Sequence, residues 1–466
     1  MSAAPDAAQR HETGPHGPVI FSLTAAIVMF APLIRGGNRP LPLAVLELAG
    51  LALLVSLAWS RRDLLAGLSS PLRWGVALLV LVPLLQLIPI PMAWWALLPG
   101  HAPFAHVLEI AGEGAGWRAI SVHPAATQYS WLVMIPCLAV FLAVRQLDRS
   151  RVRRIAMLFA CVACVEAILG VLQAGSSPGS AIHLGNPYGG GAATGTYINK
   201  NHFAGLIEMA LPMLVALWAV EMLPVVTHRG EVLREHPRNA DTRFAMRGLF
   251  SVLTIVLLLA LLLSRSRAGI SAGMLAFGVA IVTLVWKAAT VQVKAVLAIV
   301  AAGALILAAS VGLTPVLDRF APDEIAQNAG GRWALTIDSL HAALALMPLG
   351  SGLGTFADVF RRYQGGAIIG FADHAHNDYA ELLVELGVAG LAVMVLLAVA
   401  YAMRWRSVMR NKRSRRTRFL QIAAGLGMLA LAIHGLFDFN FHIPANAIYF
   451  SLLAGIFFFT PAEDRA

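Results

Sequence analysis

Charged residues are scarce in this sequence. Only 13% of its 466 residues are Asp, Glu, Lys or Arg, whereas 58% are hydrophobic and the mean hydropathy is +0.72. A soluble fold cannot bury so large a share of apolar side chains, and apolar runs of about 20 residues, the length that crosses a bilayer, recur along the chain. The composition therefore excludes a soluble globular class and predicts an all-α, polytopic bundle of transmembrane helices.

Cysteine is almost absent. The three cysteines are Cys137, Cys161 and Cys164, and each lies inside an apolar run. The last two have the CxxC spacing, but a membrane helix lacks the thioredoxin-like context that gives this motif a redox role. We therefore interpret the cysteines as packing residues. Residues 1–17 are polar, which predicts no removed signal peptide.

Apolar windows divide the chain into about twelve predicted spans. They lie at 19–34, 41–59, 73–93, 130–145, 155–172, 203–223, 248–264, 269–286, 294–312, 382–403, 420–435 and 443–459. The predicted organisation is a cytoplasmic N-terminus (1–18), spans one to nine (19–312), a long loop with short helices (313–381), spans ten to twelve (382–460) and a cytoplasmic tail (461–466). The windows that fit a membrane span least well are 73–93, which contains three prolines, and the pair on either side of Arg265.

The basic residues predict the orientation of these spans. With the N-terminus inside, most of the 35 Lys and Arg residues fall on the inner side, notably in 145–154, 224–247 and 404–418. The positive-inside rule therefore favours cytoplasmic termini, and it explains the net charge of +10 without a nucleic-acid partner. The long loop 313–381 then faces the outer side.

A titratable cluster stands at the end of this long loop. His374, His376, Asn377 and Asp378 come just before an apolar run, and a cluster of this kind at the end of a membrane helix is costly and therefore usually functional. The alternative is a polar helix start in which Asp373 or Asp378 is the N-cap and the histidines are only solvated. Alternating His374, His376 and Asp378 side chains would converge on a metal only from an extended segment, so we expect no metal.

Two arginines interrupt the apolar sequence at Leu263–Gly269, LSRSRAG. Arg265 and Arg267 lie on the predicted outer side, against the charge bias of the chain. The planar donor fork of arginine fits phosphate or diphosphate oxygens. The alternative is that both side chains reach lipid headgroups and only anchor the helix ends.

Two more polar clusters fall on the same predicted side. The segment Ala193–Gly205 contains Asn199, Lys200, Asn201 and His202 before an apolar run, and the segment His434–Asn446 contains Asp438 and His442 between the last two spans. A helix N-cap with a turn would explain the first, and a membrane-facing turn the second. Together with the histidines and arginines, however, these residues describe proton abstraction from a hydroxyl beside a bound diphosphate. A transporter is the competing class, but its charges would lie near the bilayer midplane.

Several motifs resemble those of the O-antigen ligase and O-antigen polymerase superfamily. The resemblance covers about residues 95–460, and the motifs that carry it are WRAISVHPAAT (117–127), GTYINKNHFAG (195–205), the Ser-Arg sequence of 264–267, PLGSGLGTF (348–356), HAHNDYAELLVELGVAGL (374–391) and HGLFDFNFHIPANA (434–447). The chain departs from the family pattern before the Gly-Thr block, where Ala192, Ala193 and Thr194 replace a frequent arginine.

The resemblance implies a GT-C-like, metal-independent glycosyltransferase of a bacterial inner membrane. Its donor would be a glycan on undecaprenyl diphosphate at the periplasmic face, and its acceptor lipid A-core, a second lipid-linked glycan or a protein hydroxyl. By matching, His376 would be the catalytic residue, with His374 as second choice, and Arg267 or Arg265 would bind the diphosphate. Lys200 would replace the missing arginine, and Arg332 is a further candidate. The sequence leaves ligase and polymerase as alternatives.

Overall fold

The structure is a computed structural model that describes residues 17–60, 63–221, 223, 237–286, 322–366, 368, 370–410 and 414–460. Within these described residues, eight helices are long and apolar enough to cross a membrane, and three further apolar helices are shorter. This confirms an all-α, polytopic membrane architecture. The predicted span at 294–312 lies outside the described residues. The helices that correspond to the other predicted spans are α1 (Gly17–Phe30), α2 (Pro40–Trp59), α3 (Ser70–Gln86), α6 (Pro124–Gln146), α7 (Arg149–Ala174), α8 (Lys200–Glu221), α9 (Pro237–Leu263), α10 (Arg267–Ala280), α15 (Asp378–Arg410), α16 (Arg415–His434) and α17 (Pro444–Phe457).

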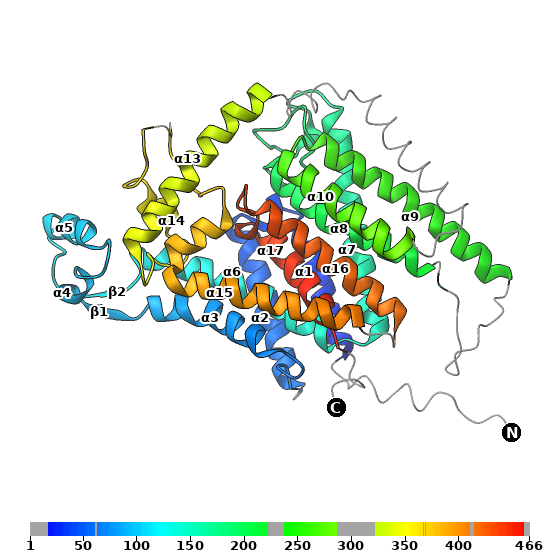
Figure 1. The fold of residues 1–466 in the computed structure, drawn as a ribbon, viewed down its shortest axis with the longest axis horizontal. Coiled ribbons are helices and arrows are strands. Elements are labelled where there is room, and N and C mark those ends of the chain that lie inside the picture. The colour runs from blue at the N-terminus through cyan, green and yellow to red at the C-terminus, as the bar shows by residue number, and fades with distance from the viewer. Residues whose placement is uncertain are drawn as a thin grey trace.

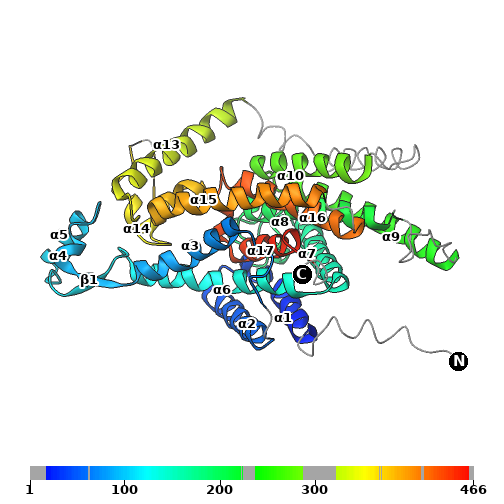
Figure 2. The same ribbon diagram turned by 60° about the horizontal axis from the view of Figure 1, so that its bottom comes forward.

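Helix α8 is the centre of the bundle. Its whole membrane-spanning window is buried by other helices, chiefly α9, α10 and α16. Figure 1 shows α8 among these helices, and Figure 2 shows α1 and α2 side by side near α6 at the periphery. A helix surrounded by protein rather than lipid can carry polar groups, because neighbouring side chains can satisfy them. Helices at the periphery of the bundle have apolar side chains on their outward faces.

The cysteine Cys161 lies on the outward face of α7 and is exposed. Our interpretation of this cysteine as a packing residue is therefore wrong.

The predicted span at 73–93 is wrong at its C-terminal end. Helix α3 ends at Gln86, and Pro89–Pro91 forms strand β1, which pairs antiparallel with β2 (Trp117–Ala119). Two prolines so close together cannot continue a helix because each lacks a backbone N–H. The chain therefore leaves the bundle after α3 and builds a small lateral segment with α4 (Met92–Trp95) and α5 (Ala102–Ile110), which projects to one side in Figure 1.

The long loop contains one long helix and one short helix. The long one is α13 (Pro322–Leu346), and the short one, α14 (Phe356–Phe360), follows it, where the sequence predicted only short helices. The glycine-rich turn between them docks on α15 where that helix is kinked at Gly387, which has a φ of 57°. A Cβ on Gly350 would lie 2.3 Å from the carbonyl oxygen of Glu385, so this close approach requires glycine.

Candidate functional site

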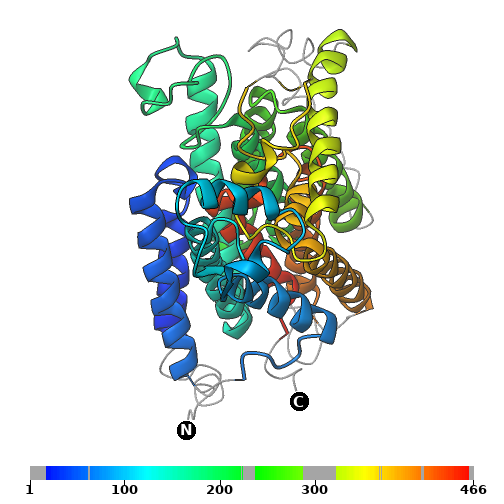
Figure 3. The same cartoon turned by 90° about the vertical axis from the view of Figure 1, so that its left-hand side faces the viewer.

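The polar clusters predicted from the sequence meet at one end of the helix bundle. The backbone N–H of Asp378 donates to the carbonyl of Gly435 at 2.8 Å, and the Asn446 amide donates to the carbonyl of His202 at 2.9 Å. These bonds join the start of α15, the end of α16, the start of α8 and the start of α17. Figure 3 shows α13 and the segment that follows α7 at the upper end of the bundle.

Helix α15 begins with an asparagine cap. The Asn377 side-chain oxygen accepts hydrogen bonds from the backbone N–H groups of Tyr379 and Ala380, both at 3.1 Å. Neither Asp373 nor Asp378 caps the helix, so the alternative in which one of them is the N-cap is wrong. The cap leaves the Asp378 carboxylate free to accept from His442, 3.1 Å from its Nδ1.

His376 is oriented by a carboxylate from a distant part of the chain. Its Nδ1 lies 3.2 Å from Oδ1 of Asp438, in the turn between α16 and α17. The His376 side chain is 29% exposed, whereas the Asp438 side chain is completely buried. The backbone of His376 has a φ of 48°, in the left-handed region that non-glycine residues seldom occupy. An Nδ1–H donated to Asp438 leaves Nε2 as the basic nitrogen of a neutral ring.

Asp438 is the common partner of four side chains. Besides His376, Asn201 donates to its Oδ2, while His202 Nε2 and an Arg332 Nη lie 3.8 Å from its carboxylate oxygens. Arg332 also donates to the carbonyl of Phe437 at 2.7 Å. The structure thus brings together residues from α8, α13 and two separate turns, all four of which were candidates from the sequence.

Asp438 is ionised despite its burial. Burial alone would raise its pKa, but the neighbouring imidazoles of His202 and His376 hold the pKa of this carboxyl well below its usual value. An ionised carboxylate beside Nδ1 stabilises the protonated imidazole of His376. The pair is therefore suited to accept a proton at Nε2 during a reaction.

A second cluster forms around Glu381, a residue that the sequence analysis did not single out. Oε1 of Glu381 lies 2.7 Å from Nδ1 of His374 and 3.2 Å from Nε2 of His442. Its other oxygen accepts the backbone N–H of Ala375 at 2.8 Å. Glu381 stands one helical turn after Asp378, which is the only signal in the sequence that places it on the same face of α15.

The side chains of His374, His376 and Asp378, which were considered above as alternating metal ligands, do not converge. Each residue has a different main partner: Glu381, Asp438 and His442 respectively. Instead His374, Glu381 and His442 bring their ligand atoms within 4.8 Å of one another, which is compatible with a metal ion. Burial opposes protonation of His442, but the carboxylates of Glu381 and Asp378 raise its pKa to about 10. In this structure the two carboxylates, Glu381 and Asp378, are already paired with the imidazoles of His374 and His442.

The ring of Phe439 separates the two clusters. It stacks on His374 with ring centroids 4.0 Å apart, and it meets His376 and His202 edge-on at 4.9 and 4.7 Å. An apolar ring between the histidines limits their contact with water and fixes the direction of each imidazole. Phe439 follows Asp438 directly, so one short turn supplies both the carboxylate and this spacer.

The arginine turn lies beside the same end of the bundle. A Cβ on Gly269, two residues after Arg267, would lie 3.2 Å from Cε1 of His434. Arg265 instead points toward the glycine loop before α8, where its Nη1 is 3.3 Å from the Cβ position of Gly191, and its buried Nε has no hydrogen-bond partner. Lys200 and Asn199 start α8, where the Asn199 side chain accepts the N–H of Asn201 at 2.8 Å, as in the predicted N-cap.

A buried histidine–carboxylate pair was missed by the sequence analysis. His434 Nδ1 lies 3.1 and 3.2 Å from the two carboxylate oxygens of Glu208, and both side chains are completely buried between α16 and α8. Glu208 lies inside an apolar run with no polar neighbour, so nothing local in the sequence marks it. The pair ties α8 to α16 directly beneath the turn that carries Asp438.

Residues 252–395 match a family model described as O-Antigen ligase. The matched segment contains the arginine turn, His374, His376 and Glu381, and the match confirms the resemblance to the O-antigen ligase superfamily. No curated protein was found to be similar to the chain. With the apolar helices, the family match supports an integral membrane protein with a glycosyl-transfer role in polysaccharide biosynthesis, acting on lipid-linked glycan and lipid substrates.

Proposed function

We propose that this chain, whose residues 252–395 match the O-antigen ligase family, transfers a glycan from undecaprenyl diphosphate to an acceptor hydroxyl without a metal ion. The reaction would take place at the periplasmic face of a bacterial inner membrane, with lipid A-core as the acceptor. The observation that carries the proposal is the pair of His376 and the buried Asp438, 3.2 Å apart, which leaves Nε2 of the histidine for a substrate hydroxyl.

In the proposed reaction His376 acts as general base. The acceptor oxygen forms a bond to the anomeric carbon of the glycan while the bond from that carbon to the phosphate oxygen breaks. The bonding electrons leave with the diphosphate, and the hydroxyl proton passes to Nε2 of His376. Asp438 keeps the Nδ1–H directed away from the substrate and stabilises the imidazolium that forms.

The surroundings of the three histidines favour His376 for this role. Both ring nitrogens of His442 face carboxylates, and its pKa of about 10 keeps it protonated at neutral pH. His374 is covered on one face by Phe439 and contacts Glu381, so it is the second choice. Asn201 and His202 then position Asp438, and Asp378 positions His442.

The leaving diphosphate requires a positively charged site. We assign this role to Arg267 and Arg265 at the arginine turn, with Lys200 at the start of α8 and Arg332 beside Asp438 as further groups. The buried Nε of Arg265, which has no hydrogen-bond partner, supports an anion there, since a buried donor without a partner is costly. Guanidinium groups would neutralise charge that develops on the leaving oxygen.

Replacing Arg267 by alanine is expected to raise the KM for the lipid-linked donor about 10- to 100-fold, because a charge-assisted hydrogen bond contributes ~1.5–3 kcal/mol. The measurement is the initial rate of glycan transfer against donor concentration, with purified protein in detergent. Arg361→Ala is the matched control, because this arginine after α14 is exposed. An unchanged donor KM in a folded Arg267→Ala protein would remove Arg267 from the diphosphate site.

Chelation tests the metal-free part of the proposal. Incubation with EDTA followed by gel filtration is expected to leave the rate of transfer unchanged, because Glu381 is already paired with both neighbouring histidines. The His442→Ala variant should respond in the same way. Loss of activity on chelation, restored by one divalent metal, would assign the cluster of His374, Glu381 and His442 to a metal ion instead.

The product of the purified protein distinguishes a ligase from a polymerase. Donor alone and donor with lipid A-core are incubated separately, and the glycan products are separated by size. One-step transfer that needs the added acceptor supports the ligase reaction. A ladder of lengthening glycans from donor alone would support repeat-unit polymerisation. Consumption of the lipid-linked donor without formation of a new covalent glycoconjugate would contradict enzyme function.

A further inference from the structure

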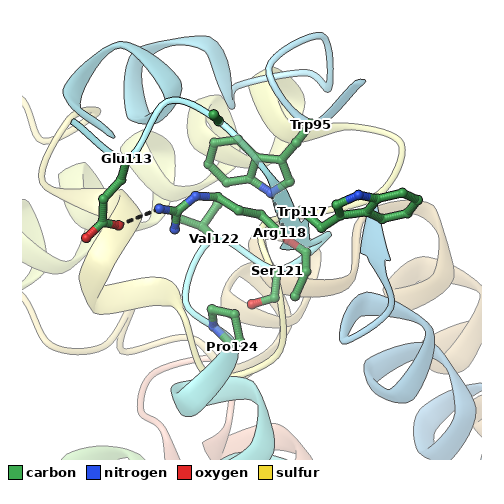
Figure 4. Close-up of a pocket in the computed structure, with 9 residues that line it drawn as sticks. Trp95, Glu113, Trp117, Arg118, Ser121, Val122 and Pro124 are labelled. Atoms are coloured by element: carbon green, nitrogen blue, oxygen red, sulfur yellow. Dashed lines mark hydrogen bonds and ion pairs between the residues drawn. The ribbon is translucent and has the colours of Figure 1, made fainter. Parts of the chain in front are cut away.

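A cavity in the lateral segment is not part of the site described above. Its volume is about 430 Å³, within the ~300–1,000 Å³ range of sites for small molecules. Figure 4 shows the residues that line it, all of which come from the segment between Trp95 and Pro124. The residues that line it are Trp95, Glu113, Ala115, Trp117, Arg118, Ala119, Ser121, Val122 and Pro124.

Two tryptophans give the cavity its aromatic surface. Trp95 is a fixed wall, because it is only 2% exposed and its indole N–H donates to the carbonyl of Ala119 at 2.8 Å. Trp117 is 70% exposed and lies on the other side of Arg118 from Glu113 in Figure 4. An exposed indole beside a cavity offers a flat face to a ligand that has an apolar side.

One ion pair gives the cavity its polar surface. Arg118 donates to Glu113 at 2.6 Å, and the Nε of Arg118 is buried without a hydrogen-bond partner. The two groups together present donors and acceptors while their charges cancel. Such a pair favours a neutral ligand with several hydroxyl groups over an anion, which Glu113 would repel.

We propose that this cavity binds a sugar unit of the glycan substrate. The C–H face of a pyranose ring would pack on Trp117, and its hydroxyl groups would bond to Arg118 and Glu113. The choice of a glycan as ligand rests on the proposed function, whereas the site itself rests on the indole faces, the neutral ion pair and the cavity.

The lateral segment is joined to the part of the chain that carries the histidines. Val122 N–H donates to the carbonyl of Ser351 at 2.8 Å, and His123 Nδ1 lies 2.8 Å from Asp358 of α14. Val122 also packs against the apolar cluster that includes Ala375, the residue between His374 and His376. A glycan held at Trp117 therefore lies on a segment that packs against the part of the chain carrying the proposed base.

Trp94 provides a matched control. It is 66% exposed, comes from the same segment, and does not line the cavity. If the exposed tryptophans of this segment only anchored it to the bilayer surface, replacing Trp94 or Trp117 would have the same effect on glycan binding. If the cavity binds a sugar, only Trp117 contributes to glycan binding.

The experiment measures binding without catalysis. Full-length His376→Ala protein in detergent is titrated with the free oligosaccharide released by mild acid from the lipid-linked donor, and separately with the de-acylated core oligosaccharide. Saturation-transfer NMR and tryptophan fluorescence report binding. Trp117→Ala and Arg118→Gln are each expected to weaken the binding of one of these oligosaccharides about tenfold, because the first removes the indole face and the second removes the guanidinium donors. Trp94→Ala should bind as the parent does.

The oligosaccharide that binds identifies the substrate: weakened core binding assigns the acceptor, and weakened binding of the donor-derived glycan assigns the donor. Equal binding by parent, Trp117→Ala and Arg118→Gln proteins would overturn the proposal, as would equal losses in Trp94→Ala and Trp117→Ala. The proposed sugar-binding cavity and the proposed enzyme function can be contradicted independently of each other. Glycan transfer that depends on His376 but is unaffected by Trp117→Ala contradicts only the cavity, and glycan binding without any transfer contradicts only the proposed enzyme function.

Discussion

Replacing His376 by alanine is expected to reduce the kcat of glycan transfer about 10²- to 10⁴-fold, the usual contribution of a general base. The donor KM should change little, because the arginines that we assign to the diphosphate are intact. The protein should also remain folded, since the His376 side chain is 29% exposed and makes one side-chain hydrogen bond, to Asp438. Transfer rates of purified protein with lipid-linked donor and acceptor give the measurement.

His374→Ala is the matched comparison for this prediction, because His374 also pairs with a buried carboxylate and contacts the same Phe439 ring. It should lose less activity than His376→Ala. Added imidazole should partly restore the rate of His376→Ala, which a purely structural role would not explain. Full activity in a folded His376→Ala protein would exclude this residue as the base, and a greater loss in His374→Ala would transfer the role to His374.

Replacing Asp438 by alanine is expected to reduce both activity and stability. The carboxylate is completely buried and faces His202, His376, Asn201 and Arg332. Removing one partner of a buried charged network costs ~3–5 kcal/mol, because the remaining groups lose their compensation. Without the Asp438 carboxylate, the His376 ring also loses its preferred tautomer, so we expect the kcat of glycan transfer to fall about 10²-fold or more. Thermal unfolding in detergent and transfer rates measure the two effects.

Asp358→Ala is the control for Asp438→Ala. Asp358 lies 2.8 Å from His123, but both side chains are largely exposed, so removing it should cost only ~0–1 kcal/mol. Asp438→Asn should retain more stability than Asp438→Ala while losing a similar share of activity, since it keeps the shape and loses the charge. Wild-type kcat in Asp438→Asn would show that the carboxylate does not assist His376.

The helical membrane architecture was predictable because it depends on local composition. Apolar runs such as those that form α8 and α16 need only length and hydropathy to be recognised, and α8 begins at Lys200, three residues before the predicted span. The error at 73–93 has a local cause as well. The apolar content of this window favours a span, but Pro89 and Pro91 lack backbone donors, and the chain forms β1 there instead.

The candidate residues were also visible in the sequence, because histidines, aspartates and arginines are rare among apolar runs. Their roles stay predictions, but the structure places them at one end of the bundle. The alternating pattern of His374, His376 and Asp378 suggested one shared site. The start of α15 at Asp378 breaks that alternation, so each of these side chains turns to a different partner.

The sequence by itself determined that the chain is a bundle of apolar helices and which residue types stand at the ends of those helices, because hydropathy and helix breakers act over short distances. Only the tertiary structure decided which of these residues are partners. His376 and Asp438 are 62 positions apart, and His434 and Glu208 are 226 positions apart. Such pairs form because helix packing brings polar groups together where neither water nor lipid can satisfy them, and no local pattern encodes which helices become neighbours.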